Sequence, residues 1–182
     1  GTPLVASHRG GTERIAFRTE ADAYASTARL RGLHTLHYER DPLISPQHFE
    51  EFMSPCYRRI KAVAERHNIP IISVDTDGWP HPIVPAMMEG GVNCIYPWEV
   101  AAGCDVNEVR RTFPELALMG GIDKRALARD EKAIDAELER VRPAMESGRY
   151  IPALDHLIPS DVPWPNYAYY ARRLRAMVIG GE

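Results

Sequence analysis

The strongest constraint on the fold of this chain is an alternation of strand-like and helix-like segments from residue 41 onward. Short runs of β-branched residues recur at intervals of roughly 25 to 30 residues, each followed by apolar residues spaced three or four positions apart. Strands that alternate with helices form βα units, whose strands pair in parallel. The pattern therefore predicts an α/β protein with about four parallel βα units.

Four strands and five helices are expected. The strands fall at residues 70–74, 92–96, 116–119 and 150–154. The helices fall at residues 46–67, 83–88 and 106–113, over a long stretch that ends at Gly148, and across the C-terminus. Ser45-Pro46 is a favourable helix start. The first helix is expected to bury one apolar face, formed by Phe49, Phe52, Cys56, Ile60 and Val63.

Polar residues follow the predicted strands, and their positions favour a barrel over a doubly wound sheet. They are Asp75 and Asp77, Glu99, Asp123 and Lys124, and Asp155 and His156. In (β/α)-barrels the carboxyl ends of the strands carry the chemistry. A dinucleotide-binding GxGxxG motif does not follow any strand. A closed barrel needs eight units, so the chain is expected to form half of one.

Composition excludes several classes of function. The net charge of −3 and the isoelectric point near 6.2 are unsuited to binding nucleic acid. Apolar runs stay shorter than the roughly 20 residues that cross a bilayer, so no membrane partner and a cytoplasmic location are expected. The three cysteines lack CxxC spacing, which argues against a disulfide framework or a zinc ribbon. Cys56 and Cys94 are expected in the core, and Cys104 is not expected to be a nucleophile.

Several motifs, in order, resemble the uroporphyrinogen decarboxylase superfamily over residues 38–178. The motifs are Pro42-Leu43-Ile44-Ser45-Pro46, Gly120-Gly121-Ile122-Asp123-Lys124-Arg125-Ala126-Leu127-Ala128, Tyr150-Ile151-Pro152, Asp155-His156 and Pro159-Ser160-Asp161-Val162-Pro163. The resemblance implies the C-terminal half of a single (β/α)₈ TIM-type barrel. The superfamily contains cofactor-free decarboxylases of porphyrinogens and zinc-dependent methyltransferases that act on corrinoid or thiol carriers.

The segment before residue 38 does not resemble the family. Residues 1–37 therefore form an unassigned N-terminal segment, and residues 38–182 form the family-like domain. The first residues are Gly1-Thr2-Pro3 rather than methionine, so a processed, trimmed or partial reading frame is expected. The family's N-terminal half supplies an aspartate for decarboxylation and basic residues that hold substrate carboxylates. The chain alone is accordingly expected to be inactive and to need that missing half or a homodimer.

The resemblance places His156 and Asp77 as catalytic candidates. His156 matches a histidine that contacts substrate and assists proton transfer, which suits a side chain that exchanges protons near neutral pH. The alternative is a histidine that forms a hydrogen bond in a turn. Substrate contacts are expected from Asp75, Trp98, Glu99, Asp155 and Arg40. Trp98 could stack on a flat macrocycle or simply cover the barrel mouth. Asp123 and Lys124 are expected to be structural, capping a helix and pairing locally.

A metal site is the second interpretation of the same strand ends. Asp75 and Asp77 occupy the place of a His-x-Cys pair in the zinc methyltransferases, and His156 stands near a third ligand. Two carboxylates and one imidazole would make a harder, weaker zinc site than sulfur and nitrogen donors. The decarboxylase interpretation implies a small-molecule substrate and no cofactor. The methyltransferase alternative implies zinc and a corrinoid partner, and a third alternative is a non-catalytic half-barrel that dimerises.

Overall fold

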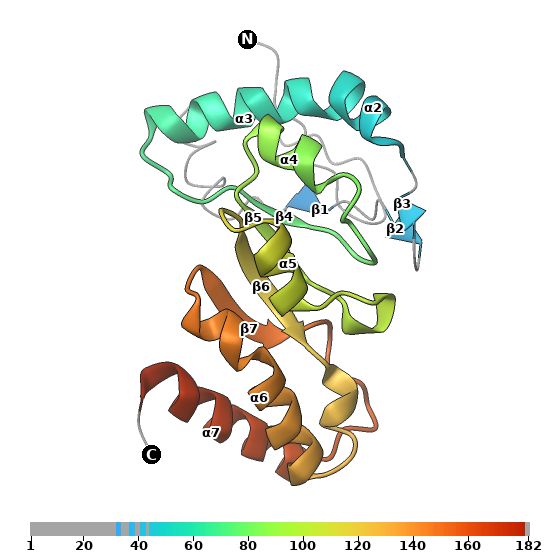
Figure 1. Ribbon diagram of the computed structural model, residues 1–182, viewed down its shortest axis with the longest axis vertical. Helices are drawn as coiled ribbons and strands as arrows, with labels where there is room; N and C mark the ends of the chain where they lie inside the picture. Colours follow the sequence, from blue (N-terminus) through green and yellow to red (C-terminus); the bar gives the residue numbers. More distant parts are fainter. Residues whose placement is uncertain (1–31, 34–36, 39–40, 43, 181–182) are drawn as a thin grey trace.

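The computed structural model describes residues 32–33, 37–38, 41–42 and 44–180. The first three pairs form short strands: β1 (Gly32–Leu33), β2 (His37–Tyr38) and β3 (Asp41–Pro42). The predicted domain boundary after residue 37 depends mostly on residues outside these ranges, so it stays a prediction. Along the long axis of the molecule, α3 and α4 lie at one end and α6 and α7 at the other, with the strands β4 to β7 between them (Figure 1).

The first long helical stretch is continuous but contains a wider π-helical turn. It consists of α2 (Pro46–His48), η1 (Phe49–Met53) and α3 (Ser54–Arg66), and the Ser45 hydroxyl accepts a hydrogen bond from the His48 amide as the N-cap. A π turn holds an extra residue, so the buried face shifts along the sequence. Phe49, Tyr57 and Ala64 are buried. The predicted core positions Phe52 and Cys56 are exposed, which corrects that part of the sequence analysis.

The remaining elements follow the predicted order with boundaries shifted by a few residues. The strands are β4 (Ser73–Asp75), β5 (Cys94–Tyr96), β6 (Ala117–Ile122) and β7 (Tyr150–Leu154). The α-helices are α4 (Val84–Gly90), α5 (Val106–Thr112), α6 (Glu131–Glu146) and α7 (Trp164–Ile179). Two 3₁₀ turns, η2 (Val100–Ala102) and η3 (Lys124–Ala126), follow β5 and β6.

The order of the strands shows how the sheet is wound. The five-stranded sheet has the order β1-β4-β5-β6-β7, and every pairing in it is parallel. Connections between parallel strands are nearly always right-handed, so a sheet whose strands follow in sequence order has its helices on one face. A doubly wound sheet instead reverses its order at a switch point. Four parallel strands that alternate with helices in this order are those of a partial TIM-type barrel.

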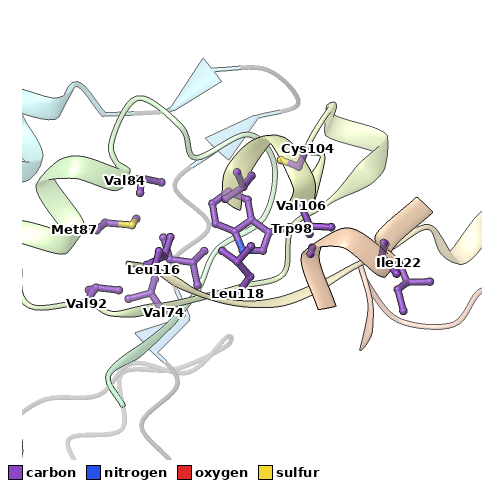
Figure 2. Packing of buried hydrophobic residues seen from close by; sticks show 14 of the residues in the cluster. Val74, Val84, Met87, Val92, Trp98, Cys104, Val106, Leu116, Leu118 and Ile122 are labelled. Carbon is purple, nitrogen blue, oxygen red and sulfur yellow. The ribbon is translucent and has the colours of Figure 1, made fainter. Parts of the chain in front are cut away.

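The core lies between the sheet and the helices. Val74, Ile95 and Leu118 are paired in register across β4, β5 and β6 and are almost completely buried. Figure 2 shows the side chain of Trp98 in the middle of this cluster, between the strand residues and Val106. Neighbouring positions along the strands face the other way, where Asp75 pairs with Tyr96 and Met119 with Ile151. Within the described part of the chain, no helix is long and apolar enough to cross a membrane.

Candidate functional site

Polar side chains gather at the carboxyl edge of the parallel sheet. Asp75 is the last residue of β4, Glu99 follows β5, Lys124 follows β6, and Asp155 follows β7. Parallel strands end at the same edge, so residues far apart in the sequence meet there. The turns that carry these side chains are anchored to neighbouring strands, because Thr76 N donates to Tyr96 O at 2.7 Å and Asp155 N donates to Ile122 O at 2.8 Å.

Asp77 and His156 come together at this edge. His156 Nε2 lies 3.8 Å from Asp77 Oδ1, and the two side chains are 40% and 36% exposed. Their strands, β4 and β7, are separated in the sheet by β5 and β6. Neighbouring strands lie about 4.8 Å apart, so on a flat sheet the two strand ends would be roughly 14 Å apart. The curvature of a partial barrel and the turns after β4 and β7 together bring an imidazole and a carboxylate side by side over the strand ends.

Behind this pair lies an ion cluster formed by Glu99, Lys124 and Asp155. Lys124 Nζ lies 3.5 Å from Asp155 Oδ1 and 3.8 Å from Glu99 Oε1. The second Glu99 oxygen accepts a hydrogen bond from Gly78 N at 3.2 Å, and the second Asp155 oxygen accepts one from Val100 N at 3.0 Å. The Lys124 amide also donates to Asp155 Oδ1 at 3.2 Å. The cluster thus joins the segments that follow all four strands from β4 to β7.

Asp155 occupies a different position from the one expected for a substrate contact. Its side chain is fully buried, and both carboxylate oxygens accept hydrogen bonds from the protein. Burial raises the pKa of this carboxyl group, while the amide and charge of Lys124 act in the opposite direction. A side chain without exposed surface cannot contact a ligand, so we assign Asp155 to holding the loops rather than to binding substrate.

Trp98 also lies in the interior. Its side chain is 0% exposed and packs in the hydrophobic core, so its indole ring is not available to stack on a substrate. Its indole nitrogen has no hydrogen-bond partner among the described residues. Of the two roles considered for Trp98, covering the barrel mouth and stacking on a macrocycle, neither describes its position, because the apolar ring is enclosed between sheet and helices.

The described residues do not form a metal centre. No group of three histidine, cysteine, aspartate or glutamate side chains among them is arranged to hold a metal ion. Asp77 and His156 approach each other, but Asp75 does not join them in such a group. Asp75 has interactions of its own at the end of β4. The donor set predicted for zinc therefore does not fit a metal in this arrangement, and we derive no chemistry from one.

Four further residues were named from the sequence, and the structure places three of them: Glu99, Asp123 and Cys104. Glu99 is partly exposed but engages both oxygens within the cluster. Arg40 lies outside the described residues. Asp123 caps η3, where Arg125 N donates to its carboxylate at 2.9 Å, as the sequence predicts. Burial raises the pKa of Cys104 to about 12, which agrees with its expected lack of nucleophilic character.

Lys124 has partners much farther away in the sequence than predicted. It was expected to pair locally, yet its partners lie 25 and 31 residues away, at Glu99 and Asp155. These partners could have been inferred from the sequence. Lys124 directly follows a predicted strand, and Glu99 and Asp155 follow two other predicted strands. Parallel strand ends converge, so a lone cation among such carboxylates has nearby partners in space.

Comparison with models of protein families shows the family of this chain. The family model described as Uroporphyrinogen decarboxylase (URO-D) matches residues 40–177, which is more than half of the chain. The match spans all four strands from β4 to β7 and the turns that carry Asp77, Glu99, Lys124 and His156. No curated protein matches the chain.

Proposed function

The chain belongs to the uroporphyrinogen decarboxylase family, and on that premise we propose that it contributes to decarboxylation of a porphyrinogen or a related carboxylated small molecule. The observation that carries the proposal is the contact between His156 Nε2 and Asp77 Oδ1 at the carboxyl edge of the sheet. A partly exposed imidazole beside a carboxylate is suited to proton transfer, because the carboxylate can orient the ring toward a substrate.

The proposed reaction needs two protons at different carbons. Protonation of a pyrrole ring carbon creates an electron sink. The bond between the acetate methylene and its carboxylate then breaks, carbon dioxide leaves, and the electron pair enters the ring. A proton added to the methylene carbon gives a methyl group, and the ring carbon returns its proton. His156 is proposed to deliver one of these protons, with Asp77 holding the imidazole in place.

The test compares conservative variants of the pair. We expect His156→Gln and Asp77→Asn to lower the rate of carbon dioxide release from uroporphyrinogen by roughly 10²-fold or more, the typical contribution of general acid–base catalysis. Glu139→Gln, an equally conservative change on an exposed part of α6, should leave the rate unchanged. The rates are measured on the protein assembled with the strands that complete its sheet. If His156→Gln and Asp77→Asn release carbon dioxide as fast as the wild type there, the proposal is contradicted.

Metal content distinguishes the methyltransferase alternative from the proposed decarboxylase. Elemental analysis of the wild type and of His156→Ala, with the mass in solution recorded on the same samples, distinguishes the two. Stoichiometric zinc that is lost in His156→Ala would favour metal-dependent methyl transfer with a corrinoid partner. We favour the cofactor-free reaction because Asp75, Asp77 and His156 do not form a metal-binding group.

We further propose that the reaction requires strands beyond those described. Among the described strands, β1 and β7 are the edges of the sheet, whereas a closed barrel has no edge. Additional strands, from a second copy or from a complementary half, would supply the basic groups that hold substrate carboxylates. On this proposal, activity depends on assembly, and the catalytic pair contributes only one side of the site.

A further inference from the structure

Asp77 and His156 are each adjacent in the sequence to a residue that is connected to Lys124. Asp77 precedes Gly78, whose amide donates to Glu99, and His156 follows Asp155. Glu99 and Asp155 both form ion pairs with Lys124. Each member of the pair is therefore connected to the same lysine through one carboxylate.

The first connection runs from Lys124 to the loop after β4. Lys124 Nζ lies 3.8 Å from Glu99 Oε1, and Gly78 N donates to Glu99 Oε2 at 3.2 Å. The Glu99 carboxylate is thus held between a cation and the amide that follows Asp77. Because Gly78 has a positive φ of 76°, the loop turns sharply at this residue, and the Glu99 contact fixes where the turn lies.

The second connection runs from Lys124 to the loop after β7. Lys124 Nζ lies 3.5 Å from Asp155 Oδ1, and the Lys124 amide donates to the same oxygen at 3.2 Å. Asp155 Oδ2 accepts from Val100 N at 3.0 Å, which also ties the segment after β5. The backbone just before His156 is consequently tied to the segment that contains Glu99 and Val100.

Charge explains why one lysine governs both connections. Asp155 is fully buried, and the Glu99 side chain is only 22% exposed, so their negative charges are poorly screened by water. Within the described part of the chain, Lys124 is the one cation that forms an ion pair with either carboxylate. Without its charge the two carboxylates would lose the cation that holds them together, and the loops they hold would be free to separate.

We propose that Lys124 is the positioning residue of this site, which holds the turns after β4 and β7 so that Asp77 and His156 remain within reach of each other. Its importance for catalysis rests on the function proposed above, whereas its effect on the loops does not. Lys124 acts through Glu99 and Asp155 rather than by direct contact with the catalytic pair.

Amide hydrogen exchange tests the proposal without an activity assay. In Lys124→Met the apolar stem is retained and the charge is lost, and we expect protection of the Gly78 and Val100 amides to fall roughly tenfold or more, since each would lose a charge-assisted hydrogen bond. The Ala133 amide, which donates to Asp130 at 2.8 Å as the cap of α6, serves as an internal control and should not change. Lys132→Met, at an exposed position of α6, is the matched control variant.

A second substitution at residue 124 distinguishes the effect of the lysine charge from the effect of the side chain's shape. Lys124→Arg keeps a cation that can reach both carboxylates, so it should restore protection at Gly78 and Val100. Unchanged protection in Lys124→Met, or an equal loss in Lys124→Arg, would overturn the proposal. If Lys124→Met does not fold, Glu99→Gln provides the second variant. It weakens only the first connection, so protection should fall at Gly78 and persist at Val100, and equal loss at both amides would overturn the proposal.

A kinetic measurement connects the exchange result to catalysis. For carbon dioxide release from uroporphyrinogen, Lys124→Met should lower kcat about tenfold with little change in KM, because Lys124 does not contact the substrate. Absence of release by the wild type assembled with the strands that complete its sheet would contradict the proposed function and leave the exchange result to decide the positioning role. A rise in KM at constant kcat would instead make Lys124 a substrate-binding residue and overturn the proposal.

Discussion

His81 lies within a cluster of aromatic rings in the loop after β4. Its ring stacks on Trp79 with centroids 4.7 Å apart, meets Trp98 edge-on at 5.6 Å, and lies 6.2 Å from Phe113. Its buried Nδ1 atom has no hydrogen-bond partner among the described residues. Burial lowers the pKa of His81, and the charge of Glu108 offsets part of this effect. The neutral imidazole is thus the form that the folded protein favours.

The environment of His81 predicts a loss of stability in mild acid. Because the pKa is lower in the folded than in the unfolded state, the unfolded chain binds a proton first as the pH falls below about 6.5. We expect the melting temperature of the wild type to fall more between pH 7.5 and pH 5 than that of His81→Phe, which keeps an aromatic ring in the stack. Between pH 8.5 and 7.5 the two proteins should change in parallel. Equal acid sensitivity would contradict the prediction.

At single residues, the sequence predicted which side chains lie at the carboxyl edge better than it predicted how exposed each one is. It placed His156, Asp77 and Glu99 at the carboxyl edge because each follows a strand, and strand ends are visible in the sequence. It did not distinguish Asp155 from His156, although one is buried and the other exposed. Exposure depends on which neighbouring turn covers a residue, and for Asp155 that turn contains Val100, 55 residues earlier.

Among the elements, β6 extends beyond its predicted end. It was expected to end at Met119, before two glycines, but it extends to Ile122. Gly120 and Gly121 have φ angles of 93° and 79°, which an L side chain rarely adopts. A Cβ atom at Gly121 would collide with Val106 Cγ1 of α5. The glycines therefore allow close packing of strand and helix, and do not end the strand.

This packing predicts a large cost for Gly121→Ala. The left-handed backbone should contribute about 1–2 kcal/mol, and the overlap with Val106 about 1–3 kcal/mol more. Gly148→Ala is the matched control, since Gly148 also has a positive φ of 76° but a Cβ atom there would meet no other atom within 4 Å. Urea unfolding should show the larger loss for Gly121→Ala. Equal losses would mean that backbone strain alone accounts for the effect.

The long N-terminal helix shows a second limit of sequence patterns. Its existence follows from Ser45-Pro46 and from apolar residues at helical spacing. The buried face was predicted wrongly at Phe52 and Cys56, because a π turn at Phe49–Met53 adds a residue that an α-helical period does not contain. A π turn has no clear sequence signature, so the phase of the helix became known only from the structure.

At the scale of the whole molecule, the described sheet has the winding of a barrel and the edges of an open sheet. Strand β7 has a described neighbour, β6, on one side only. Ile151 on this strand is 54% exposed, an unusual position for a β-branched residue in a parallel sheet, where strands are normally covered on both faces. Exposed strand edges tend to pair with other chains unless charged side chains, proline, a bulge or a covering segment opposes it.

This edge predicts association that depends on β7. Light scattering should give a mass above the 20.5 kDa of one chain at micromolar concentration. Ile151→Lys should shift the protein toward the single-chain mass, because a charged side chain on an edge strand opposes pairing. Ile179→Lys, at a 66% exposed residue that ends α7, is the matched control and should associate like the wild type. If the two variants behave alike, or if the wild type has the mass of one chain at every concentration, the contact does not run through β7.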